Sequence, residues 1–159
     1  MTNPALDGDL RDLYQDLILD HGKKPRNFRV LDKANHEALG HNPLCGDRLV
    51  LYMTVGPQDI IQDVAFQGSG CAISVASASM MSEMLKGKSL KEADALFQTV
   101  HAACTGEADL KSSGIDDDDL SRIQALAGVR HYPMRVKCAT LAWHTMQAAL
   151  KNKTKVSTE

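Results

Sequence analysis

The sequence predicts an α+β fold: a small antiparallel β-sheet of about three strands, packed against an N-terminal helix and several C-terminal helices. Residues 47–56 and 60–67 each carry apolar residues in strand-like patterns, and the turn-forming residues between them predict a β-hairpin. From residue 71 onward the apolar spacing becomes helical. The chain has 159 residues, the length of one domain, so we expect a single domain over 1–159 with flexible tails at 1–9 and 151–159.

The first element is an amphipathic helix over residues 10–21, in which the apolar residues 10, 13, 14, 17 and 18 share one face. Gly22 and Pro25 end this helix. A weaker strand pattern near 35–41 precedes the hairpin. Helices then follow over 71–85, over 89–104 with a Ser89/Glu92 capping box, over 117–126 behind the acidic run 116–119, and over 138–150 after a connector at 133–137.

Composition excludes some partners and locations. The 18 basic and 20 acidic residues leave a net charge of −2, so no positive field is available to bind nucleic acid. No apolar run approaches the length of a transmembrane helix, and the first residues show no secretory signal. We therefore expect a cytoplasmic protein with neither a nucleic-acid nor a membrane partner.

Three of the four cysteines lie where one predicted element gives way to the next, which favours reactive thiolates over buried side chains. Cys45 precedes the first clear strand, whereas Cys71 and Cys138 each open a predicted helix. Asp47 shares a side with Cys45 if the chain there is extended, and three thiolates plus one carboxylate suit zinc or an iron–sulfur unit. Packing in the core is the alternative for any free cysteine, and it is the interpretation we favour for Cys104.

Three blocks around these cysteines resemble the signatures of the U-type iron–sulfur cluster assembly proteins, the IscU, SufU and NifU N-terminal family. The blocks are LCGDR at 44–48, GSGCAIS at 68–74 and RVKCATLAW at 135–143, and Tyr14 with the patterns at 20–21 and 25–27 fits as well. The resemblance spans about residues 10–150. The chain is most similar to the SufU branch, because Lys137 stands where the scaffold branch has a histidine and the interval between Cys71 and Cys138 is long.

The resemblance to SufU implies a zinc-dependent sulfur acceptor, a sulfurtransferase-like carrier that serves a pyridoxal-phosphate cysteine desulfurase of the SufS type. It implies that Cys45 receives the persulfide sulfur and that Arg135 helps to dock the desulfurase. A lysine ammonium is a hydrogen-bond donor but no metal ligand, so Lys137 would support the Cys138 thiolate or meet an acidic partner. One zinc would be held by Cys45, Asp47, Cys71 and Cys138.

Two other functions remain open at this stage. The same ligands could assemble a transient [2Fe–2S] cluster with iron and pass it to apo-proteins, which would make the chain a scaffold. Alternatively, a zinc ion could serve only to hold together a non-catalytic adaptor. As a sulfur acceptor, the chain would pass its sulfur to a downstream SUF scaffold or to apo iron–sulfur proteins.

Overall fold

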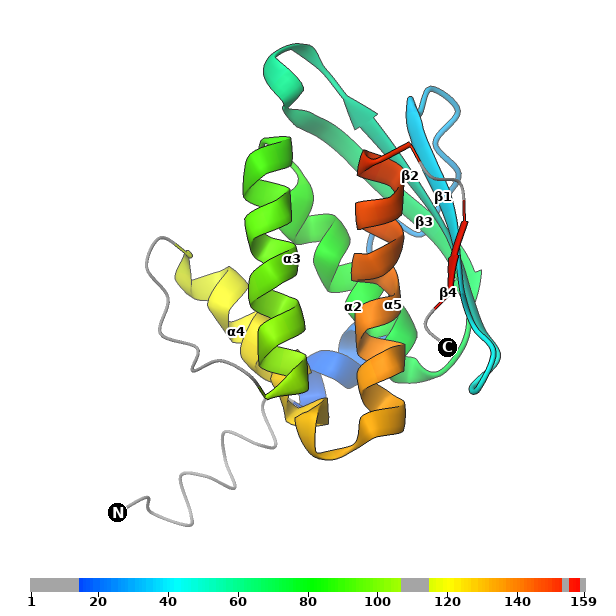
Figure 1. The fold of residues 1–159 in the computed structure, drawn as a ribbon, viewed down its shortest axis with the longest axis vertical. Helices are drawn as coiled ribbons and strands as arrows, with labels where there is room; N and C mark the ends of the chain where they lie inside the picture. The colour runs from blue at the N-terminus through cyan, green and yellow to red at the C-terminus, as the bar shows by residue number, and fades with distance from the viewer. Residues whose placement is uncertain (1–14, 107–114, 153–154, 158–159) are drawn as a thin grey trace.

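The structure confirms the α+β class and adds a fourth strand to the predicted sheet (Figure 1). The computed structural model describes residues 15–106, 115–152 and 155–157. Its elements are β1 (His36–Asn42), β2 (Asp47–Val55), a 3₁₀ turn (Pro57–Asp59), β3 (Ile61–Ser69), α2 (Ala72–Leu85), α3 (Leu90–Thr105), α4 (Asp117–Ala127), a second 3₁₀ turn (Gly128–His131), α5 (Pro133–Leu150) and β4 (Lys155–Ser157).

The sheet has the strand order β3-β2-β1-β4. β2 pairs antiparallel with both β1 and β3, so the predicted hairpin is present and the weak strand pattern near 35–41 is a real strand. β4 pairs in parallel with the outer edge of β1. Its residues 155–157 fall within the predicted C-terminal tail. The sheet is therefore mixed, with β4 covering the edge that β1 would otherwise present.

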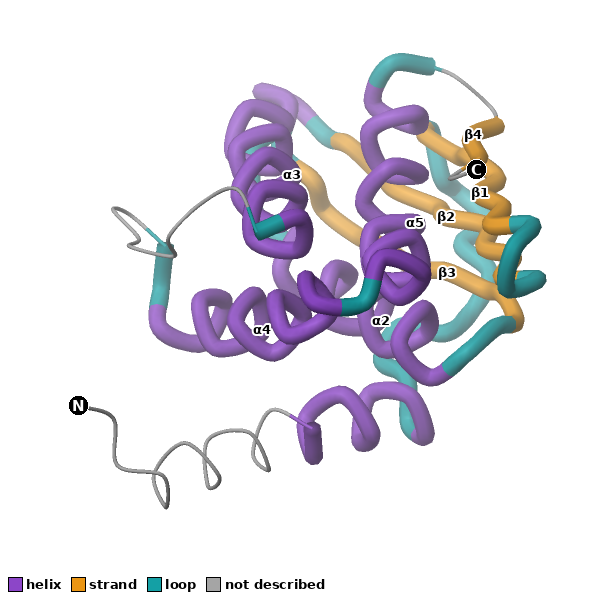
Figure 2. The backbone as a smooth tube through the Cα atoms, turned by 60° about the horizontal axis from the view of Figure 1, so that its bottom comes forward, coloured by secondary structure: helices purple, strands orange, loops and turns teal. Residues whose placement is uncertain are grey.

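The core lies between one face of the sheet and the helices α2 and α5, with α3 and α4 packed outside them (Figures 1 and 2). Alternate residues of β2 point into this core, and Leu51 and Met53 are fully buried there. Trp143 of α5 is the largest of the fully buried side chains. Burial on several sides explains why α2, rich in alanine and serine, shows little amphipathic pattern.

The capping signals in the sequence predict the starts of α3 and α4 correctly. Ser89 and Glu92 form the capping box of α3, each side chain bonded to the other residue's backbone N–H. Asp116 caps α4, and its carboxylate accepts the backbone N–H of Asp119 at 2.8 Å. Asp119 is itself buried and pairs with Lys88 at 3.0 Å. The acidic run therefore serves the helix start, as its position predicts.

The predicted start of the last helix at Cys138 is wrong, because α5 begins at Pro133. Proline is favoured in the first helical turn, where its fixed φ fits and its missing N–H needs no partner. The segment 133–137, predicted as a connector, is thus the first turn of the helix. Cys138 lies in the second turn, where its side chain is only 3% exposed.

The N-terminal helix is described from residue 15 and continues to residue 23. Residues 10–14 of the predicted helix lie outside the described residues. Leu17 and Ile18 pack against the core, and His21 is buried against α2. The ring Nδ1 of His21 lies 2.7 Å from the hydroxyl of Ser79, and its Nε2 lies 3.6 Å from the carboxylate of Glu83.

We expect the metal-free protein to lose stability as the pH falls from about 7 to about 5. Burial lowers the pKa of His21 below its ordinary value, and burial together with His101 lowers the pKa of His144. The unfolded chain therefore takes up protons, near the ordinary histidine pKa of 6.5, that the folded chain resists. Urea unfolding across this range should show a smaller loss for His21→Gln than for wild type. Equal losses would contradict a role for His21.

Candidate metal centre

Cys45 lies in the turn between β1 and β2. The last pair of these strands joins Asn42 to Asp47, so residues 43–46 form the connection. Gly46 has a φ of 71°, a left-handed conformation that glycine adopts without steric cost. The turn leaves the Cys45 side chain exposed, and this thiol is therefore accessible to another molecule.

Asp47 is the first residue of β2 and is fully buried, so its carboxylate needs polar partners. One oxygen, Oδ1, accepts the backbone N–H of Cys71 at 2.9 Å, and Oδ2 accepts the side-chain amide of Asn42 at 3.3 Å. Gly70 is packed so closely that an added Cβ would overlap Oδ1 of Asp47. The connection from β3 to α2 thus closes directly over this carboxylate.

Cys138 approaches the same place from α5. Its Sγ lies 3.6 Å from Nδ2 of Asn42, which donates to it, and 3.6 Å from the carbonyl of Met134. Burial raises the pKa of the Cys138 thiol well above its usual range, and Asp47 and Cys45 raise it further. The raised pKa favours the protonated thiol in the metal-free protein. A bound cation would take the place of its proton.

The structure brings Cys45, Asp47 and Cys138 together: one ligand atom from each lies within 4.8 Å of the other two. Two sulfurs and a carboxylate oxygen, held by three different elements, suit zinc and other metals that accept thiolates. Cys71 is not part of this group, although a side-chain interaction with Cys71 is among the smaller causes that raise the pKa of the Cys138 thiol. A fourth ligand from Cys71 therefore remains a prediction.

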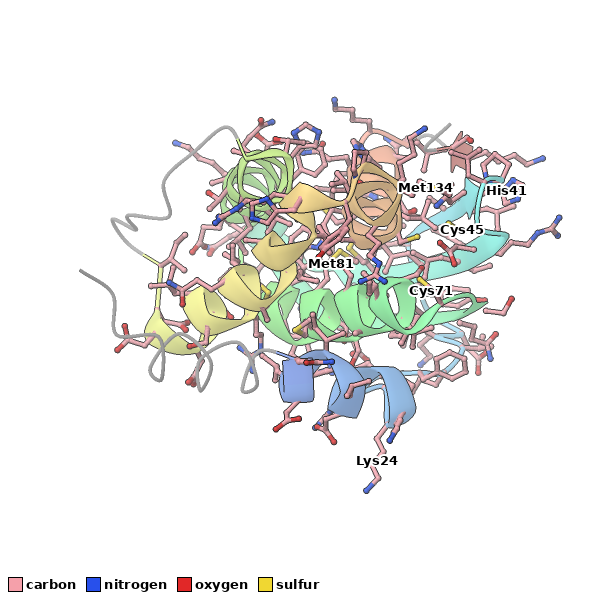
Figure 3. All side chains as sticks on the ribbon, turned by 90° about the horizontal axis from the view of Figure 1, so that it is seen from below. Lys24, His41, Cys45, Cys71, Met81 and Met134 are labelled. Atoms are coloured by element: carbon pink, nitrogen blue, oxygen red, sulfur yellow. The ribbon has the colours of Figure 1, made fainter. Side chains whose placement is uncertain are left out.

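Apolar and cationic residues that neighbour Cys45 and Cys138 in the chain form a rim, and Figure 3 labels one of them, Met134, together with Cys45 and Cys71. Leu44, next to Cys45, and Met134, on the first turn of α5, are both exposed by more than half. Arg135 is exposed as well, and its guanidinium lies 5.0 Å from the centre of the Tyr132 ring, within the range of a cation–π contact. Lys137 is half-buried.

Sequence reasoning placed Cys104 correctly and missed Asn42. Cys104 is fully buried, and burial raises the pKa of its thiol to about 12, which makes it unreactive. Asn42 lies just outside the strand predicted near 35–41, and an asparagine amide is not a usual zinc ligand. The sequence pattern therefore does not predict it as a residue of the site. One feature of the sequence could have indicated Asn42. It is a polar residue at a core-facing position of β1, directly before the turn that carries Cys45.

A chain with this α+β fold and this cluster of two cysteines and one aspartate matches a known family of proteins. A family model described as the NifU-like N-terminal domain matches residues 13–139, and the chain belongs to this family. The predicted resemblance to the SufU-type members of the IscU and NifU group is confirmed by the relatives below. Among the described residues, no helix combines the length and the apolar character needed to span a membrane.

One relative is the zinc-dependent sulfurtransferase SufU of Bacillus subtilis, 40% identical over 144 residues that cover 90% of this chain and 92% of the relative. Another is the iron–sulfur cluster assembly scaffold protein IscU of Streptococcus pyogenes, 39% identical over 89% of this chain and 85% of the relative. A crystal structure from Fervidobacterium islandicum, described as a candidate assembly scaffold of the SUF system, superposes with a TM-score of 0.76 at 34% identity. The superposition covers 88% of this chain and 98% of the crystallised chain.

Proposed function

We propose that this chain takes part in iron–sulfur cluster assembly as a zinc-dependent sulfur acceptor for a cysteine desulfurase of the SufS type. The observation that carries the proposal is the pairing of an exposed thiol, Cys45, with two buried potential ligands, Asp47 and Cys138. An exposed sulfur is accessible for exchange while the buried residues hold the metal. The similarity to the SufU relative supports zinc as that metal.

The donor set fits zinc, with Cys71 proposed as the fourth ligand beside Cys45, Asp47 and Cys138. When bound, zinc keeps its thiolate ligands deprotonated at neutral pH and adds no redox chemistry of its own. In the transfer, the Cys45 thiolate attacks the outer sulfur of the desulfurase persulfide. A new S–S bond forms on Cys45, the S–S bond on the desulfurase breaks, and the desulfurase cysteine leaves as a thiolate.

The rim beside the cluster suits the desulfurase encounter. Arg135 offers an exposed guanidinium that the Tyr132 ring helps to orient, and Lys137 adds a second cation. We assign Arg135 to docking, and Lys137 to support of the Cys138 thiolate or contact with an acidic partner. Downstream, the sulfur would pass to a SUF scaffold or to apo iron–sulfur proteins.

The test measures alanine production by the desulfurase in iron-free buffer, with the zinc-loaded protein, with the chelator-treated protein and with neither. We expect the zinc-loaded protein to accelerate turnover and the chelator-treated protein to do so far less. Restoring zinc to the treated protein should restore the acceleration. If the zinc-loaded protein gave no more alanine than the desulfurase alone, or gave less, the sulfur-acceptor function would be contradicted.

A cluster scaffold is the second candidate, favoured by the similarity to the IscU relative from Streptococcus pyogenes. Thiolates hold [2Fe–2S] clusters as well as zinc. Anaerobic reconstitution with iron and sulfide should then yield a cluster that transfers to an apo-protein. Failure to retain iron under these conditions would count against the scaffold.

A further inference from the structure

Asn42 is a buried polar residue beside the cluster to which the transfer chemistry assigns no role. It is the last residue of β1, it faces the core, and no part of it is exposed. Its strand partner is Asp47, and its amide nitrogen lies near the sulfur of Cys138 on α5. One side chain thus contacts two of the three clustered groups.

Both contacts are made by the amide nitrogen as a donor. Nδ2 lies 3.3 Å from Oδ2 of Asp47 and 3.6 Å from Sγ of Cys138. The opposite amide orientation would place the Oδ1 lone pairs against the Asp47 carboxylate, which would be repulsive. The N–H groups therefore face the two residues that are anions when they bind a metal.

The other end of the amide has no partner. Within the part of the chain that the structure describes, Oδ1 of Asn42 is one of two buried side-chain nitrogen or oxygen atoms without a hydrogen bond. A buried polar atom without a partner costs stability. An apolar residue at this position would avoid that cost, so the fold gains nothing from the orphaned oxygen. The two donated bonds remain the reason for an asparagine here.

We propose that Asn42 is a positioning residue that holds the Asp47 carboxylate and the Cys138 sulfur as metal ligands. This inference rests on the proposed function. The amide N–H groups stabilise negative charge on both groups and fix their directions, as outer partners do in metal sites. Asn42 bonds to the two buried groups, and the exposed Cys45 is left as the sulfur that exchanges.

The experiment compares Asn42→Ala and Asn42→Asp with wild type, using zinc alone in competition with a chromophoric chelator. We expect Asn42→Ala to lower the zinc affinity about 10- to 100-fold, the range typical of lost outer-shell partners. Cobalt(II) substitution supplies a spectroscopic readout: the sulfur-to-cobalt charge-transfer bands should shift in both variants.

Asn35→Ala is the matched control. Asn35 also makes two hydrogen bonds to the sheet, through the backbone of Val55, but it lies at the opposite end of β1. We expect it to lower the free energy of unfolding and to leave the zinc affinity and the cobalt spectrum unchanged. A purely structural role for Asn42 would give the same pattern in Asn42→Ala and would overturn the proposal.

A measurement on the wild-type chain keeps the test decisive if either variant fails to fold. On titration with zinc, the side-chain amide signal of Asn42 should shift in a ¹⁵N–¹H spectrum, and that of Asn35 should not. An unmoved Asn42 signal would overturn the inference. The readouts use metal alone, so a desulfurase assay that fails in wild type would refute the sulfur-acceptor function and leave the role of Asn42 to be decided by these data.

Discussion

We expect Cys45→Ala to lose sulfur acceptance from the desulfurase, by on the order of 100-fold or more, because the attacking atom itself is removed. The side chain is exposed in a turn, so its loss should leave the fold and the free energy of unfolding nearly unchanged. The measurement is transfer of ³⁵S from labelled cysteine, with the labelled position identified by mass spectrometry.

Cys104→Ala is the control for this change, since its buried thiol has a raised pKa and lies outside the cluster. It should accept sulfur as wild type does. Label on Cys45→Ala at the wild-type level would refute Cys45 as the acceptor. If Cys45→Ala instead unfolds together with metal loss, the site is structural, as a non-catalytic zinc adaptor requires.

The second large effect is expected for Asp47→Ala, which should reduce zinc affinity by about 100-fold or more, at or beyond the upper end of the range for outer-shell partners. The change removes a proposed ligand and the acceptor of the Cys71 backbone N–H and the Asn42 amide. It should also destabilise the metal-free protein by about 1–3 kcal/mol for the buried Asn42 amide left unpaired, and by less for the part-buried Cys71 N–H. Chelator competition and urea unfolding measure the two effects.

Two further variants sharpen this prediction. Asp63→Ala removes a half-buried carboxylate of β3 that pairs with Arg29, and it should leave zinc affinity unchanged. Gly70→Ala keeps every proposed ligand but would push its new methyl group into Oδ1 of Asp47, so it should weaken zinc binding through geometry alone. Wild-type affinity in Asp47→Ala would show that the carboxylate is no ligand.

Much of the fold could be predicted because its signals are local. The alternation in β2 and the capping box of α3 act within a few residues, and both are where the sequence predicts them. The predicted start of α5 is wrong because the sequence predicts a connector over 133–137, where the structure has the first turn of the helix. Proline is favoured at the first position of a helix but ends a helix when it stands in the interior. The sequence around Pro133 does not distinguish these two cases, and the packing of α5 does.

The α+β class, the family and the short link between Cys45 and Asp47 could all be predicted from the amino-acid sequence. Which distant groups meet them depends on the tertiary structure: Cys138, buried on α5, comes within 4.8 Å of both, whereas Cys71 reaches Asp47 through its backbone N–H and lies outside the group of three ligand atoms. Asn42 likewise gains its role through contacts across the core. The physical reason is that the alternation and turn signals of a strand act over a few residues. Desolvation and a shared hydrogen-bond donor depend instead on how β1 and α5 pack.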